Sequence, residues 1–217
     1  HRELFKDVEH PTLGTWPLQN APFKLSETPV INSSAGPLIG EHNKDVFEGL
    51  LGMGHSDLLA GFEDGTFWPK NYDMGVYPYL DKMLKDHSKV TWLGNSKGPN
   101  KPPEPKMTSQ TAATGALSGI TVLELADEKG EWCGKLLGDM GADVIKIEPP
   151  GGEATRTVGP FLDDLPHRER SLSFWHYNTS KRGITLNLES EDGRALFRSL
   201  VPTADIVLES YSLGYLP

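Results

Sequence analysis

The chain contains a single cysteine, Cys133, among its 217 residues. One cysteine excludes a disulfide within the chain and fits a reducing cytoplasm, where we expect this protein to work. No apolar run approaches the roughly 20 residues that a membrane-spanning helix needs. No signal peptide is visible, although a chain that starts with His1 says little about targeting. We therefore expect no membrane partner.

Positive charge is also scarce. The 21 Lys and Arg residues stand against 30 Asp and Glu, which gives a formal net charge of −9. This balance provides no electrostatic footprint for nucleic acid or for an anionic membrane surface, so neither is an expected partner. A polyanionic ligand would need a local cluster of positive side chains.

Several common binding motifs are missing. Gly151-Gly152 is not followed by the further glycines of a dinucleotide fingerprint, and no Walker pattern occurs. His10, His42 and His55 lack the spacing of metal ligands, so we expect no metal.

The most regular stretch runs from Gly119 to Arg156 and predicts a strand followed by a helix. The strand is expected at Ile120–Leu125, which is short, apolar and rich in β-branched residues. Gly141 stands where the C-terminal cap of the helix would fall. Cys133 lies on this helix, so we expect its thiol to be packed in the core and not to act as a nucleophile. The apolar residues that recur at helical spacing are Trp132, Leu136, Leu137 and Met140.

A second strand is expected at Val144–Ile147, ended by Pro149–Gly152, which cannot continue a strand. Two strands joined by a helix form a βαβ unit, whose strands are parallel and whose crossover is right-handed. Further strands are expected at Ile184–Leu188 and Asp205–Leu208. Ligands of such sheets bind beyond the carboxyl ends of the strands. The sequence therefore predicts a site near Ala126–Gly130 and the proline–glycine turn.

Composition divides the chain into parts. Residues Asn95–Thr114 hold four prolines and no aromatic, Leu, Ile or Val residue, which predicts an extended, semi-rigid linker. We expect a first part at 1–67, a connecting segment with this linker at 68–117, and a second part at 118–217.

The residues of the second part indicate a particular protein family, which their hydrophobic pattern alone does not. The runs GxxCxxLLxDMGADVIKIEPPGG, NTSKRGITLNLES and ADIVLES, between Gly119 and Tyr215, resemble the amino-terminal region of the family III CoA-transferases of the CaiB/BaiF type. The resemblance implies an α/β fold with a Rossmann-like parallel sheet and flanking helices, incomplete in this part. It also implies coenzyme A or acyl-CoA as co-substrate, a small carboxylic acid as partner, and no metal.

The first part resembles the carboxyl-terminal end of the same family, through HPxLG, PFKLSxTP and PLxGEHNxxVxxxLLG. Two short helices are expected there, at Asp45–Leu51 and Ser56–Phe62, with Ser56 as N-cap. A family carboxyl end that precedes a family amino end indicates a tandem fusion of two copies, and two unrelated domains are the alternative.

On the tandem interpretation, 1–67 is the carboxyl-terminal tail of a first α/β copy, and the other copy in the same chain is an expected partner. Because the chain starts with His1 and stops at Pro217, we expect an internal fragment that spans the junction. Each half should then complete a separate domain, and the fragment should be unstable and inactive alone. The sequence leaves both a monomer and a homodimer of the whole protein as alternatives.

Candidate site residues follow from the resemblance. CoA presents an adenine, a 3′-phosphate and a pyrophosphate, which call for a flat apolar surface, cations and backbone donors. The basic pair Lys181 and Arg182 matches a segment that lies along the nucleotide, and a solvated pair at a strand start is the alternative. Tyr211 matches an aromatic near the adenine or closes the core at a strand end. Ser210 replaces the family's amide and has less hydrogen-bonding reach.

A further loop adds Gly130 and Pro149 to the candidate CoA contacts, since Gly130 matches a glycine that lets backbone approach the ligand. Glu128 departs from the family's Gln or Arg, and it either pairs with Lys129 or faces a cationic acyl donor. Arg156 matches an arginine that follows the glycine turn, and a surface salt bridge with Glu153 is the alternative.

Family III enzymes use an aspartate that forms an acyl anhydride. The resemblance places this nucleophile outside 1–217, so no residue here is assigned a catalytic role. Among tandem members, the GEWCGKLLGDMGADVIKIEPPGG wording is most similar to transferases that act on dimethylsulfoniopropionate and release dimethyl sulfide. The alternatives are a tandem transferase for another acid, such as a carnitine-like betaine, and a non-catalytic CoA-binding homologue.

Overall fold

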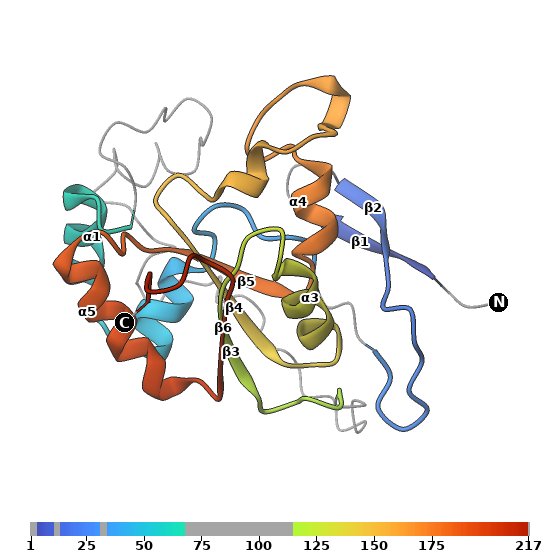
Figure 1. Ribbon diagram of the computed structural model, residues 1–217, viewed down its shortest axis with the longest axis horizontal. Helices are drawn as coiled ribbons and strands as arrows, with labels where there is room; N and C mark the ends of the chain where they lie inside the picture. Colours follow the sequence, from blue (N-terminus) through green and yellow to red (C-terminus); the bar gives the residue numbers. More distant parts are fainter. Residues whose placement is uncertain (1–3, 11–13, 31–33, 68–114, 217) are drawn as a thin grey trace, which may run out of the picture.

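The computed structural model describes residues 4–10, 14–30, 34–67 and 115–216. A β-hairpin and two helical turns come first, and an α/β unit follows (Figure 1). The predicted linker, Asn95–Thr114, lies wholly outside the described residues, as does most of the connecting segment 68–117. In chain order the elements are β1 (Phe5–His10), β2 (Gly14–Gln19), the π-helical turn η1 (Asp45–Leu50), α1 (His55–Asp64), β3 (Thr121–Leu125), α3 (Glu131–Asp139), β4 (Asp143–Glu148), the 3-10 turns η3 (Ala154–Thr157) and η4 (Leu162–Asp164), α4 (Leu172–Tyr177), β5 (Lys181–Thr185), α5 (Glu191–Leu200), the 3-10 turn η5 (Val201–Thr203) and β6 (Ile206–Glu209).

Four parallel strands form the central sheet, in the order β5-β4-β3-β6. This arrangement confirms the α/β class and the parallel pairing expected for the first βαβ unit. Val144 of β4 lies opposite Val122 of β3 on one side and Lys181 of β5 on the other. The strand β5 begins at Lys181, ahead of the predicted start at Ile184.

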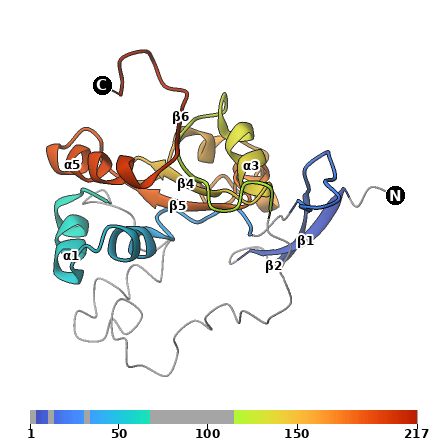
Figure 2. The same cartoon turned by 90° about the horizontal axis from the view of Figure 1, so that it is seen from below.

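The two faces of the sheet differ in chemistry, because side chains alternate along each strand. Figure 2 shows α3 on one side of the strands and the helices of residues 45–64 on the other. The face under α3 carries buried charged residues, namely Glu124, Lys146, Glu148 and Lys181. The opposite face is apolar and contributes Leu123, Leu125, Ile145, Ile147, Ile184 and Leu186 to the main hydrophobic core.

Residues from the first part of the chain cover the apolar face. Val46 and Phe47 of η1 and Leu58 of α1 are fully buried, and they belong to the same hydrophobic cluster as the sheet. Phe197 and Leu200 of α5 complete that cluster. The described residues contain no helix long and apolar enough to cross a membrane.

The first part also pairs with the outer edge of β5. The backbone N–H of His42 donates to the carbonyl oxygen of Gly183 at 2.9 Å. The Asn43 side chain accepts from the N–H of Thr185 at 2.8 Å, while its Nδ2 donates to the Thr185 hydroxyl at 3.0 Å. The GEHN motif therefore satisfies an edge strand that would otherwise present unpaired backbone groups.

These contacts bear on the expectation that each half completes a separate domain, which stays a prediction for the longer protein. Residues 34–67 and 115–216 share one core, because the apolar face of the sheet needs a cover and the first part supplies it.

The predicted N-cap of the second helix is corrected by the structure. Gly54, not Ser56, precedes α1, and no side chain caps that helix.

Truncation of Phe47 tests this shared core. We expect Phe47→Ala to lower the free energy of unfolding by about 3–5 kcal/mol, since it removes a fully buried ring and leaves a cavity against the sheet. Leu50→Ala in the same turn is the control, because Leu50 is 40% exposed. Urea unfolding measures both variants. Equal, small effects would show that the two parts do not share a core.

Candidate functional site

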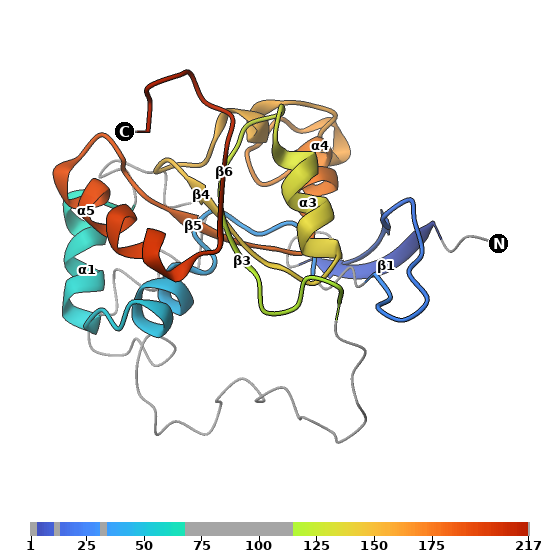
Figure 3. The same cartoon turned by 60° about the horizontal axis from the view of Figure 1, so that its bottom comes forward.

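The loops that leave the carboxyl ends of the strands meet at one edge of the sheet. The strands β3 and β6 run in the same direction, and the chain leaves both at this edge (Figure 3). A pocket of about 330 Å³ lies there. It is lined by Ile147, Glu148 and Pro149 after β4, by Leu186, Asn187, Leu188 and Glu189 after β5, and by Tyr211, Ser212 and Tyr215 after β6.

Ser210 locks the loop after β6 to the loop after β3. Its hydroxyl donates to Asp127 Oδ1 at 2.6 Å and accepts from the Asp127 N–H at 2.9 Å. Lys129 Nζ lies 2.5 Å from Asp127 Oδ2, so Lys129 pairs with Asp127 and not with Glu128. Partial burial works to raise the pKa of Asp127, but the hydrogen bonds from Lys129 and Ser210 lower it to about 2. Asp127 is therefore a carboxylate at neutral pH.

Gly130 leaves room for Ala126 within the loop after β3 and lies next to Ser210. A Cβ atom built on Gly130 would lie 2.7 Å from the Ala126 Cβ and 3.5 Å from the Ser210 Cβ. Gly130 and Ser210, both predicted site residues, are thus brought together.

Pro149 and Tyr211 are brought together as well, since both line the pocket. The Tyr211 ring packs against the main hydrophobic core and meets the Tyr215 ring edge-on at 4.8 Å between centroids. Burial and the nearby Glu153 charge raise the pKa of Tyr211, so its hydroxyl stays protonated. Tyr211 therefore offers an aromatic face and a hydrogen-bond donor at the pocket.

A buried ionic network lies beneath this edge, under α3. The ammonium of Lys146 is 3.2 Å from Glu124 Oε1, 3.1 Å from Glu131 Oε1 and 3.2 Å from Glu153 Oε1. It also donates to the carbonyl oxygen of Ala126 at 2.8 Å. Burial alone would lower the pKa of Lys146, but the surrounding carboxylates outweigh it and raise the pKa.

Lys181 belongs to the same network. Its ammonium donates to Glu124 Oε1 at 2.8 Å, to Asn178 Oδ1 at 2.8 Å and to the Glu131 carbonyl oxygen at 3.0 Å. The side chain is fully buried. Burial lowers the pKa of Lys181 to about 8, partly offset by Glu124.

This placement corrects the prediction for the basic pair. Lys181 has all three hydrogens committed inside the protein, so it is not available to a ligand at the surface. Arg182 forms a bidentate pair with Asp143, the first residue of β4, and therefore lies toward the amino-terminal edge of the sheet. Both residues start β5, whereas the pocket lies where the strands end.

The helix α3 turns an unexpected face to the sheet. Its buried residues are Glu131, Gly134, Lys135, Gly138 and Asp139, and the predicted apolar stripe is only half-buried. A Cβ atom on Gly134 would lie 1.6 Å from Glu124 Oε2, so only glycine fits over that carboxylate. Cys133 is exposed, which corrects its predicted place in the core.

A second ion pair holds the far end of α3. Lys135 Nζ lies 2.8 Å from Asp139 Oδ2 and donates to the Thr179 hydroxyl at 2.5 Å. Ser180 donates to Asp139 Oδ1 at 2.8 Å. The NTSK motif thus fixes α3 on the sheet.

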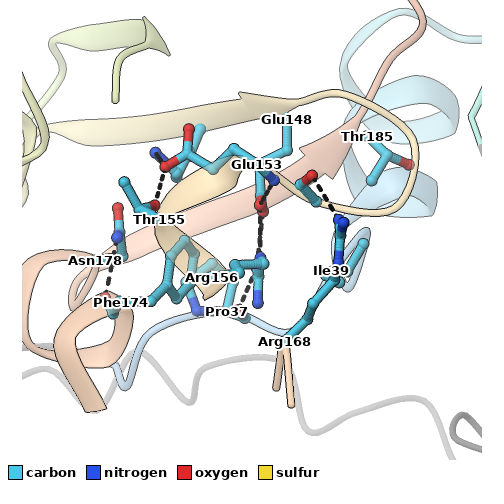
Figure 4. A network of polar contacts seen from close by, with 12 residues as sticks. Pro37, Ile39, Glu148, Glu153, Thr155, Arg156, Arg168, Phe174, Asn178 and Thr185 are labelled. Atoms are coloured by element: carbon cyan, nitrogen blue, oxygen red, sulfur yellow. Dashed lines mark hydrogen bonds and ion pairs between the residues drawn. The ribbon is translucent and has the colours of Figure 1, made fainter. Parts of the chain in front are cut away.

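Arg156 is fully buried and fixes the glycine turn beside the pocket (Figure 4). Its guanidinium donates to both oxygens of Glu148, at 2.6 and 2.7 Å, and to Glu169 Oε2 at 2.7 Å. It also donates to the Pro37 carbonyl oxygen at 2.9 Å and stacks 3.8 Å above the Phe174 ring centroid. Neither sequence-based alternative, a ligand contact or a surface pair with Glu153, describes this residue.

Exposed cations lie around the pocket. One is Arg194 of α5, which donates to the carbonyl oxygens of Leu188 and Glu189 at 3.1 and 2.9 Å. Two more are Arg168 and Lys129. Arg168 is exposed and donates to the carbonyl oxygens of Gly151 and Gly152, the second at 3.1 Å. Lys129, beside Gly130, is also exposed. None of the three was a predicted CoA contact, because an isolated basic residue carries no sequence signal of its own.

Aromatic residues near α3 fall into two groups. Trp132 stacks on His176 with 6.1 Å between ring centroids, and Tyr177 meets both rings edge-on. Trp175 is instead buried in the core, where its ring lies 4.2 Å from that of His10. Within the described ranges, no three His, Cys, Asp or Glu side chains come together as metal ligands.

Comparison with known proteins supports the predicted family. Residues 117–217 match the model of CoA-transferase family III. The succinate–glutarate CoA-transferase of Agrobacterium fabrum is 45% identical over 109 residues, which are 48% of this chain and 27% of that protein. The succinyl-CoA:(R)-benzylsuccinate CoA-transferase subunit BbsE of Thauera aromatica is 40% identical over 99 residues, 46% of this chain and 24% of that protein.

A solved structure of a CAIB/BAIF family protein from Brucella suis is 46% identical, with a TM-score of 0.42 over 46% of this chain and 27% of that one. The chain spans about a quarter of the length of the relatives it matches.

Replacement of Lys181 tests its corrected role. We expect Lys181→Ala to lower the free energy of unfolding by about 3–5 kcal/mol, because it leaves the buried Glu124 without one of its two cations. Arg182→Ala is the matched control and should cost less than about 1 kcal/mol, since its ion pair with Asp143 is partly exposed. Chemical denaturation measures both. If Lys181→Ala kept its stability, the buried placement would be wrong.

Proposed function

We propose that the protein is a family III CoA-transferase, which moves CoA between an acyl-CoA and a carboxylic acid, and that residues 115–216 supply part of its CoA site. The observation that carries the proposal is the family match over residues 117–217 together with a pocket at the carboxyl edge of the matched sheet. Open α/β sheets bind their ligands at this edge.

In the proposed CoA site, Tyr211 supplies the aromatic face for the adenine and Pro149 an adjoining apolar wall. Gly130 lets the backbone approach the ligand, and Ser210 holds the loop that carries Tyr211. The phosphates need positive charge, and the exposed side chains of Lys129 and Arg168 supply it at this edge. This set replaces the predicted Lys181 and Arg182.

The chemistry needs a nucleophile as well. In family III enzymes an aspartate carboxylate attacks the acyl-CoA and releases the CoA thiolate, which gives an acyl-aspartyl anhydride. The thiolate attacks the aspartyl carbonyl, expels the donor acid and forms an aspartyl-CoA thioester. The acceptor carboxylate then displaces CoA from this thioester, and the thiolate takes the acceptor acyl group from the new anhydride and frees the aspartate. We propose that this aspartate lies in another part of the full-length protein, as does the other copy of the proposed tandem. The 217-residue chain alone should then be inactive.

Tyr211→Ala tests the proposed CoA site in the full-length protein. We expect CoA affinity to fall by about 1–3 kcal/mol, the range found when an aromatic ring that stacks on a base is removed. Trp16→Ala is the control, because Trp16 is an exposed aromatic on the β1–β2 hairpin. Isothermal titration calorimetry with CoA measures both. An unchanged affinity in Tyr211→Ala would remove Tyr211 from the site.

A narrower proposal concerns the acid. We propose dimethylsulfoniopropionate, which receives CoA as a thioester and then loses dimethyl sulfide and an α proton by β-elimination, so that an acryloyl thioester remains. A sulfonium cation is recognised by aromatic faces and by a carboxylate. Trp132 and Tyr177 form such an aromatic group, and Glu128 is exposed in the loop that leads to α3. The neighbouring Trp175 is buried and offers no face to a ligand.

A dicarboxylic acid is the second candidate, because the matched relatives are named for succinate, glutarate, mesaconate and oxalate. Such an acid carries a second carboxylate where dimethylsulfoniopropionate carries a cation. The sulfonium acid therefore needs negative charge in the acyl pocket, and a dicarboxylic acid needs positive charge there.

An assay with the full-length protein separates these candidates. Incubation with acetyl-CoA and dimethylsulfoniopropionate should release dimethyl sulfide, which headspace gas chromatography detects. Parallel reactions contain succinate, oxalate or carnitine in place of the sulfonium acid. Transfer to one of these without dimethyl sulfide would leave the CoA-transferase proposal and reject the sulfonium substrate. CoA binding without transfer to any acid would indicate a non-catalytic homologue.

A further inference from the structure

Buried negative charge exceeds buried positive charge beneath the pocket. Glu124, Glu131 and Glu153 surround the ammonium groups of Lys146 and Lys181, and all five side chains are at most 5% exposed. An uncompensated charge in such a place is costly, and a carboxyl group avoids the cost by keeping its proton. One proton balances this group of five.

The contacts of the Thr155 hydroxyl indicate which carboxyl group keeps this proton. The Thr155 hydroxyl has one hydrogen, yet it contacts Glu131 Oε1 at 2.9 Å and also Glu153 Oε1. It can donate to only one of them. Glu131 Oε1 also accepts from Asn178 Nδ2 at 2.9 Å and faces Lys146, which is the environment of a carboxylate.

Glu153 has the poorer environment for a charge. Its Oε2 is buried and has no hydrogen-bond partner among the described residues. Its Oε1 competes for the three hydrogens of Lys146 with Glu124 Oε1, Glu131 Oε1 and the Ala126 carbonyl oxygen.

The geometry points to Glu153 as the protonated group. We propose that Glu153 donates its proton to the Thr155 oxygen while the Thr155 hydroxyl donates to Glu131, and that this relay fastens the glycine turn to the start of α3.

The electrostatics agree with the relay. Burial raises the pKa of Glu153 to about 8, against the opposing charge of Lys146. Burial also works to raise the pKa of Glu131, but the charge of Lys146, together with the hydrogen bond from Asn178, lowers it to about 2. The groups that face this pair are Lys146 and Glu148 of β4, Lys181 of β5, Asn178 after α4, and Tyr211 after β6. Glu124 of β3 faces the two lysines.

The relay bears on the proposed CoA site, and this step rests on that proposal. Glu153 directly follows Gly151-Gly152, and its N–H donates to Glu148 Oε2 at 3.1 Å, in the wall of the pocket. Its charge also acts on Tyr211. When Glu153 ionises, a buried negative charge is added next to the site of a polyanion. Glu153 is therefore a positioning residue, and CoA affinity should fall as the pH rises through about 8.

Infrared spectroscopy of the full-length protein tests the proton itself. The carbonyl band of a protonated carboxyl group should be present at pH 7 and disappear with a midpoint near pH 8. Glu153→Gln should lack this band, and Glu189→Gln, at an exposed carboxyl of the pocket, should keep it. A native protein without the band at pH 7, or a Glu153→Gln protein that retains it, would overturn the proposal.

CoA titrations at pH 7 and pH 9 test the coupling to the site. The native protein should bind CoA about tenfold more weakly at pH 9, the size expected for one added charge near the phosphates. Glu153→Gln stays neutral, so its affinity should change less by that factor. The ionisation of CoA and that of Lys181, whose pKa is also about 8, occur in both proteins and cancel in this comparison. Equal pH dependence in both would reject the coupling. If the carbonyl band of Glu153 were present but CoA bound at neither pH, the proposed function would be rejected, whereas the assignment of the proton to Glu153 would stand.

Discussion

The ammonium of Lys146 is the interaction on which the rest of the structure depends. It lies within 3.2 Å of carboxyl groups from β3, α3 and the turn after β4, and so ties a strand, a helix and a loop together at one point. Removal of one partner of such a buried group is costly, because the others are left unbalanced. The network therefore keeps α3 and the glycine turn in fixed positions at the carboxyl edge, where the proposed CoA site requires a defined shape.

Much of the fold was predictable because local patterns and topology agreed. The strands at 121–125 and 143–148, the helix between them and their parallel pairing follow from short apolar runs and a glycine after the helix. The buried face of α3 was not predicted. Helical periodicity was judged from apolar residues alone. The buried side of α3 instead carries Glu131, Lys135 and Asp139, which recur at intervals of four. Gly134 and Gly138, also four apart, were the available signal of a close approach to the sheet.

The candidate site was predictable to a similar degree. Gly130, Pro149, Ser210 and Tyr211 follow strands, and residues that follow parallel strands meet at one edge. Lys181 and Arg182 precede the body of their strand, and a basic pair in a sequence does not reveal which edge it occupies. Only the register, with Lys181 opposite Val144, places them toward the other end. Glu153 carried no sequence signal, since its unusual environment is built by residues from three other elements.

The two faces of the sheet explain why residues 34–67 belong to this unit. A parallel sheet needs cover on both faces. The helices α3 and α4 lie over the ionic face, but among the described elements of the second part α5 alone packs on the apolar face. Phe47 and Leu58 fill the remaining area, while Asn43 pairs with the edge of β5. The inverted order of the two family-like segments is therefore compatible with one folded unit, because burial of the apolar face depends on contact in space and not on order along the chain.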